Sequence, residues 1–119
     1  MPDVLTDSER WYAERQVIGA MMLAPHLSCT KVYKWLEWHD FTDPRHQLLF
    51  STIAVAWSDC LEQFGDFWWP DALIEKLEFY EELQAVGGRE YLSDLIKSVK
   101  NVAHTKYFAD QLIQNPNLG

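Results

Sequence analysis

A glycine inside an apolar helical stripe is the feature that most constrains the fold of this chain. Four apolar residues recur at the spacing of one buried helix face, namely Val17, Ile18, Met21 and Met22. Gly19 lies inside that face, where glycine costs roughly 1 kcal/mol relative to alanine. Since a missing side chain permits close packing, we expect a second helix to cross the backbone at Gly19.

A second stretch, residues 40–50, predicts the partner helix. Asp43 is a favoured helix N-cap residue, and Pro44 follows at the first helical position, where proline is tolerated. The apolar pattern then continues to near Phe64, and Gly65 ends it. We expect this long helix to be the one that crosses the first helix at Gly19.

The remaining sequence also predicts helices. Pro25 ends the first helix, because proline forces the preceding residue out of the α region. Gly87 and Gly88 form the clearest break, and we expect one of them to adopt a positive φ. No segment has the alternation of a strand, so the fold class is all-α, a compact helical bundle followed by a C-terminal helical hairpin. The expected helices lie near 8–24, 28–40, 44–64 and 70–79, with a short helical turn at 81–85 and two helices within 88–114.

Charge and composition narrow the function classes. The 119 residues are enough for one domain, and the net charge of −8 argues against direct nucleic-acid binding, which needs a basic face. The acidity favours solubility or a basic protein partner. We expect the charged residues of the first helix, Glu9, Arg10, Glu14 and Arg15, to face solvent.

The aromatic residues and cysteines add two expectations. Six tryptophans either fill the core or line a partner surface, and residues 64–69 are unusually aromatic, with Phe64, Phe67, Trp68 and Trp69. Cys29 and Cys60 have no disulfide-framework spacing. No signal peptide or membrane-spanning run is visible, so we expect reduced thiols and a cytoplasmic location.

Catalytic and cofactor motifs are absent from the pattern. Gly87 and Gly88 are not followed by the Lys-Ser or Lys-Thr pair of a phosphate loop. One cluster could imitate a metal site, because it places His39, Asp40, Asp43 and His46 at ligand-like intervals. Asp43 already serves as a cap, however, so we expect no metal, no cofactor and no enzyme.

The two helices after Gly88 are the best candidates for function. So short a link between them predicts an antiparallel αα-hairpin. Either the hairpin protrudes and buries its apolar residues against another molecule, or it folds back and completes the core of its own chain. The spacing alone does not separate these two alternatives.

Four segments together resemble the N-terminal domain of DnaB-type replicative DNA helicases. They are residues 14–20, the turn and helix start at 40–50, the segment 86–95 around the two glycines, and the last helix at 101–113 with Tyr107 and Phe108 near its middle. No single segment is specific, but all four occur in the family's order. The resemblance implies a globular part at about 8–86 and a hairpin at about 88–114.

The resemblance also implies partners. In this family the hairpins pair between subunits, and the dimers assemble into the collar of a hexameric helicase. That collar is a platform for a DnaG-type primase and in some systems for a helicase loader. The ATPase motifs of the family are absent here, so the alternatives are a non-catalytic dimerisation and docking domain or a free-standing adaptor or decoy that binds a helicase or primase. The implied interface residues are Tyr91, Leu92, Leu95, Ile96, Val99, Phe108 and Leu112.

Overall fold

The computed structural model describes residues 6–23, 36–63, 69–79 and 81–114 of the chain. All regular secondary structure in these ranges is helical, which confirms the all-α class. The segment 24–35, which holds most of the expected second helix and Cys29, lies outside them, as do Phe64, Phe67 and Trp68 of the aromatic stretch. The elements are α1 (Asp7–Leu23), η1 (Trp38–Asp40), α3 (Pro44–Gln63), α4 (Trp69–Phe79), α5 (Gly88–Ser98), η2 (Val102–His104) and α6 (Thr105–Gln114).

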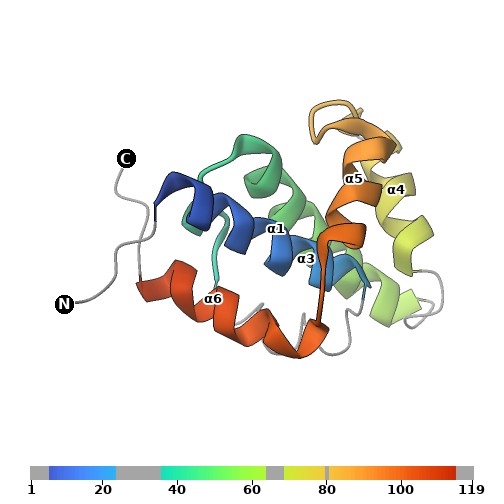
Figure 1. The fold of residues 1–119 in the computed structure, drawn as a ribbon. Helices are drawn as coiled ribbons and strands as arrows, with labels where there is room; N and C mark the ends of the chain where they lie inside the picture. The colour runs from blue at the N-terminus through green and yellow to red at the C-terminus, as the bar shows by residue number, and fades with distance from the viewer. Residues whose placement is uncertain (1–5, 24–35, 64–68, 80, 115–119) are drawn as a thin grey trace.

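Helix α1 runs through the middle of the molecule and packs against α3, α4, α5 and α6 (Figure 1). It begins with a capping box, in which the Glu9 amide donates to Thr6 Oγ1 and the Thr6 amide donates to the Glu9 carboxylate, both at 3.1 Å. From Gln16 to Met22 every residue is buried. This part of α1 is therefore buried on all sides, and not along the single stripe that was expected from the sequence.

Gly19 does mark a close helix crossing, but the crossing helix is α5, not α3. A Cβ placed at position 19 would lie 2.3 Å from the carbonyl oxygen of Leu95 and 2.6 Å from Cγ2 of Val99. The side-chain amide of Gln16, one turn earlier, donates to the Ser98 carbonyl at 2.7 Å, which satisfies a carbonyl at the C-terminal end of α5. The periodicity therefore identified the face of α1 that another helix approaches, but it did not identify α5 as that helix.

Helix α3 begins where the sequence predicted. The Asp43 carboxylate accepts the Arg45 amide at 2.9 Å, which is the bond of an N-cap residue, and Pro44 is the first helical residue. α3 packs against α4 and α1. The core at this contact includes Leu49, Ile53, Leu73 and Leu77, all fully buried.

Three residues with positive φ shape the joint between α4 and α5. Glu81 (φ 57°) ends α4, with the Glu82 amide donating to the Leu77 carbonyl at 2.8 Å. Gly87 (φ 103°) and Gly88 (φ 77°) then turn the chain into α5, so the positive φ expected at this pair is confirmed. The helical turn expected at 81–85 is a series of hydrogen-bonded turns instead, in which the amides of Val86, Gly87 and Gly88 donate to the carbonyls of Glu82, Gln84 and Leu83 at 3.1, 3.1 and 2.9 Å.

The segment after Gly87 folds back and completes the core of its own chain. We call α5, η2 and α6 together, residues 88–114, the C-terminal segment. Both long helices of the segment have their main contacts with α1 rather than with each other, so the antiparallel pairing expected from the short link is not what buries their apolar side chains. The link explains this arrangement, because Val99 and Asn101 adopt extended conformations that redirect the chain between the helices (Figure 1).

Candidate interaction site

The candidate site is the region where the C-terminal segment lies on α1. Its interior is apolar, and Leu92, Leu95 and Leu112, three of the seven residues implied by the family resemblance, are 2%, 0% and 0% exposed within their own chain. The other four, Tyr91, Ile96, Val99 and Phe108, are partly exposed. The structure thus brings the predicted residues together on one segment, but divides them into a buried group and a group that reaches the surface.

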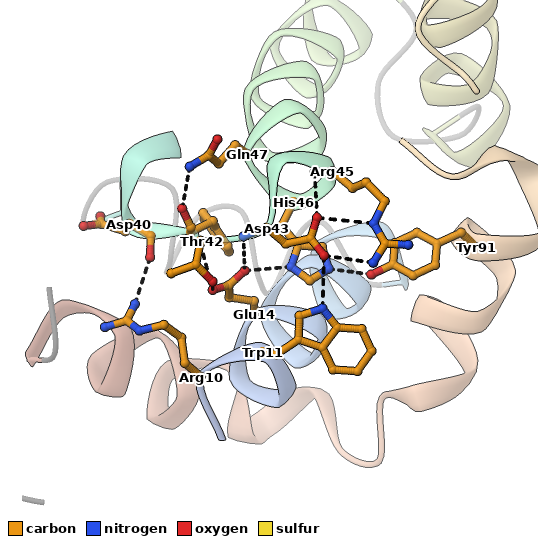
Figure 2. Close-up of polar contacts among 11 residues, drawn as sticks. Arg10, Trp11, Glu14, Asp40, Thr42, Asp43, Arg45, His46, Gln47 and Tyr91 are labelled. Carbon is orange, nitrogen blue, oxygen red and sulfur yellow. Dashed lines mark hydrogen bonds and ion pairs between the residues drawn. The ribbon is translucent and has the colours of Figure 1, made fainter. Parts of the chain in front are cut away.

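A buried polar cluster joins three helices beside this apolar contact (Figure 2). Nδ1 of His46 lies 2.7 Å from Oε1 of Glu14, and both side chains are 0% exposed. The other ring nitrogen, Nε2, lies 2.6 Å from the hydroxyl of Tyr91. Glu14 comes from α1, His46 from α3 and Tyr91 from α5, so the cluster fixes the position of α5 against the rest of the molecule.

The Glu14 carboxylate has enough donors to remain charged although it is buried. Thr42 donates to Oε2 through its amide at 2.9 Å and its hydroxyl at 2.7 Å, and the Asp43 amide lies 3.3 Å from Oε1. Burial would raise the pKa of Glu14, but the hydrogen bonds from His46 and Thr42 outweigh it and hold the pKa below its usual value. Because Glu14 is ionised, Nδ1 of His46 is the donor in their bond. The expectation that Glu14 faces solvent is wrong, as is the same expectation for Arg10, which is buried and donates to the Asp40 carbonyl at 3.1 Å.

A layer of arginine and aromatic side chains covers the cluster. Arg45 binds the Asp43 carboxylate at 2.8 Å and places its guanidinium carbon 4.0 Å from the centre of the Tyr91 ring. Arg15 lies 4.7 Å from the Trp11 ring centre and 5.5 Å from that of Tyr91. Trp11 in turn donates its indole N–H to Asp43 at 3.1 Å.

This layer affects two ionisable groups. Burial raises the pKa of Tyr91, so its hydroxyl stays protonated. Burial would also raise the pKa of Asp43, but hydrogen bonds from the side chain and amide of Arg45 and from Trp11 hold it far below its usual value. The cluster therefore contains two firmly ionised carboxylates, those of Glu14 and Asp43, under two guanidinium groups.

The four ligand-type residues noted at 39–46 have other partners. His46 uses both ring nitrogens within the cluster, and Asp43 binds Arg45. His39 pairs with the Glu37 side chain at 3.1 Å, and the Asp40 carboxylate accepts the Glu37 amide at 2.8 Å. Within the part of the chain that the structure describes, no group of three or more His, Cys, Asp or Glu side chains is placed to hold a metal ion. Ligand-like intervals in the sequence thus mark a capped helix start, and His46 belongs to a buried hydrogen-bond chain.

An aromatic surface on α1 and α6 was not predicted from the sequence. Tyr12 packs edge-on against Phe108, with ring centres 5.6 Å apart, and Phe108 packs in the same way against Tyr107 at 5.3 Å. Tyr107 is 60% exposed and Tyr12 40%. The available signal was the periodicity of α6, which buries Thr105, Ala109 and Leu112 and leaves Tyr107 on the opposite face.

Fold and site together define a class, namely a small all-helical domain whose organised features are packing surfaces and a buried polar cluster. Comparison with known proteins identifies the family. A model of the DnaB-like helicase N terminal domain matches residues 7–114, and the chain belongs to this family. No curated protein matches the chain.

A solved structure supports the same assignment. The crystal structure of the N-terminal domain of DnaB helicase from Mycobacterium tuberculosis superposes with a TM-score of 0.75 at 26% sequence identity, covering 88% of this chain and 69% of that one. The resemblance inferred from four sequence segments is thereby confirmed.

Proposed function

We propose that this chain acts as a non-catalytic assembly and docking domain of a DnaB-type replicative helicase. The observation that carries the proposal is the family match over residues 7–114, which includes all of the C-terminal segment. The architecture supports it, because the organised features among the described residues are apolar and aromatic packing surfaces. The proposed partners are a second copy of the chain, as a dimer or a trimer of dimers, and a DnaG-type primase or helicase loader.

The seven residues implied by the resemblance have two roles in this proposal. Tyr91, Ile96, Val99 and Phe108 reach the surface and can contact a partner directly. Leu92, Leu95 and Leu112 are buried against the core and hold the segment in position for such a contact. Apolar burial on association contributes about 25 cal/mol per Å² before the costs of association are subtracted.

Charge supports protein partners over DNA. The net charge of −8 would repel a phosphate backbone, whereas it attracts a basic protein surface. None of the helices in the described ranges is long and apolar enough to cross a membrane. The proposal places the domain in the cytoplasm, with no cofactor.

Light scattering after gel filtration over a wide concentration range tests self-association, and titration with the cognate DnaG-type primase tests docking. Variants Ile96→Asp and Phe108→Asp should weaken one or both interactions, with circular dichroism to check that they fold. Val55→Asp is the matched control, since Val55 is 54% exposed on α3, outside the C-terminal segment. A wild-type chain that is monomeric at every concentration and binds neither primase nor loader would overturn the proposal.

A further inference from the structure

The layer that covers the buried polar cluster has the composition of a contact surface. We call Trp11, Arg15, Arg45 and Tyr91 together the arginine layer. All four side chains reach the surface, and Trp11 is 39% exposed while the side chain of Arg45 is 37% exposed. Tryptophan, tyrosine and arginine are the residue types found most often at the energetic centre of protein interfaces. Three helices, α1, α3 and α5, supply them at one place.

Arg15 carries a charge that no carboxylate of the described residues pairs with directly. In those ranges Arg45, Arg89 and Lys106 form ion pairs with carboxylates, and Arg15 is in none of them. This is unexpected in a chain with 18 acidic and 10 basic residues. A guanidinium group presents parallel N–H donors that match the two oxygens of a carboxylate. The arginine layer therefore offers a place for an anion on an otherwise acidic molecule.

The two carboxylates of the cluster are occupied by other donors. Oδ1 of Asp43 accepts the amide and Nε of Arg45, and Oδ2 accepts Nη2 of Arg45 and the indole N–H of Trp11 (Figure 2). The Glu14 carboxylate is fully buried and bonds to Thr42 and His46. The pair with Asp43 also leaves Nη1 of Arg45 for another acceptor. An external anion would thus add to these contacts without replacing one.

Arg15 is already held in place before any partner arrives. Its guanidinium carbon lies 4.7 Å from the Trp11 ring centre and 5.5 Å from that of Tyr91. The Trp11 ring stacks on His46, with centres 6.2 Å apart, and Nε2 of His46 lies 2.6 Å from the Tyr91 hydroxyl. A side chain packed between two fixed rings loses little conformational freedom when it binds a ligand, which favours affinity.

We propose that the arginine layer binds an acidic side chain, aspartate or glutamate, of a partner protein, with Arg15 as the principal contact. The inference rests on the docking role in the proposed function and adds a partner chemistry to it. The net charge of −8 disfavours an extended polyanion such as a nucleic acid, whereas one or two carboxylates need only the local positive charge. Such a charge contact fixes the register of a partner more than it adds affinity.

Titration with a capped peptide of four glutamates, at constant ionic strength, tests the proposal. The indole N–H signal of Trp11 in nitrogen–proton NMR is the reporter, because this group lies in the layer, and the variant Trp11→Phe assigns it among the six tryptophans. We expect the peptide to shift this signal to saturation, and the corresponding peptide of four glutamines to leave it unchanged. Arg15→Gln should bind the glutamate peptide about tenfold more weakly.

Arg89→Gln is the matched control, since it removes one positive charge from an exposed arginine of α5 that already pairs with Glu78. Arg15→Lys keeps the charge but loses the planar donors, so it should weaken binding about threefold, and it replaces Arg15→Gln if circular dichroism shows that the latter does not fold.

Three results would overturn the proposal. They are an unchanged Trp11 signal, equally strong binding of inorganic phosphate, and an effect of Arg89→Gln as large as that of the Arg15 variants. The last two would indicate a general attraction of anions. Light scattering and primase titration measure the proposed function separately, so a chain without peptide binding would lose this site and keep that function.

Discussion

The C-terminal segment is attached to the rest of the molecule at two places built on different principles. At Gly19, α5 crosses α1 so closely that a single methyl group would meet the Leu95 carbonyl. At Glu14, a fully buried carboxylate bonds to His46, which bonds to Tyr91. The first contact depends on volume alone and the second on charge and hydrogen bonding. The comparison teaches that α5 is held in place both by the absence of a side chain on α1 and by ionisable side chains of α1 and α3.

The largest effect is expected at the crossing. Gly19→Ala gains about 1 kcal/mol of helix propensity but forces α5 away from α1, so we expect a net loss of about 3 kcal/mol in the free energy of unfolding. The clash involves a backbone carbonyl, which cannot rotate away as a side chain can. Urea denaturation followed by circular dichroism measures the loss. Ser51→Ala, at an exposed position of α3, is the control, and equal stability of the two variants would contradict the close crossing.

The next effect is expected in the polar cluster. Glu14→Gln keeps the shape of the side chain but removes the charge that His46 and Thr42 bond to, so stability should fall by about 2 kcal/mol. Urea denaturation at neutral pH gives this value. Glu90→Gln, an exposed residue in the first turn of α5, serves for comparison. A Glu14→Gln chain as stable as wild type would mean that the carboxylate carries no net stabilisation.

Acid should separate the two attachments. The folded-state pKa of Glu14 is held below the value of 4.5 that it has when unfolded. Its stabilisation is therefore complete above that value and is lost as the pH falls through the lower folded pKa. Thermal unfolding from pH 7 down to pH 3 should show wild type losing more stability than Glu14→Gln, whereas Gly19→Ala should follow the slope of wild type. Parallel curves for wild type and Glu14→Gln would refute the linkage.

The smallest effect is expected at Tyr91. Tyr91→Phe removes the hydroxyl from Nε2 of His46 and leaves the rings packed, so we expect a loss of about 1 kcal/mol. Tyr107→Phe is a matched control, because Tyr107 is 60% exposed and its hydroxyl accepts a hydrogen bond from Gln111 of the same helix. Calorimetry distinguishes the two, and a larger loss for Tyr107→Phe would contradict the role of the buried cluster.

The features that could be predicted from the sequence are local. The Asp43 cap, the start of α3 at Pro44 and the positive φ at the glycine pair follow from residues within a few positions of each other. The close approach at Gly19 could also be predicted, because a glycine within the apolar face of a single helix is visible in the sequence. Its partner was not, because periodicity defines a buried face and not the element that covers it.

The candidate site was harder to predict because its residues are far apart in the sequence. Glu14 was expected to face solvent. It is buried because Thr42 and His46, about 30 positions later in the sequence, form hydrogen bonds with its carboxylate. Likewise, the resemblance implied interface residues on the C-terminal segment, but it could not say that Leu95 and Leu112 lie inside the chain while Tyr107 lies outside.

The central position of α1 has a consequence for synthesis of the chain. α1 leaves the ribosome before α5 and α6, which cover much of it. Its apolar side chains therefore stay uncovered until those two helices have been made, which is the condition under which nascent chains aggregate or recruit chaperones. A helix that is well protected in the native molecule is thus unprotected while the segment that covers it is still being made.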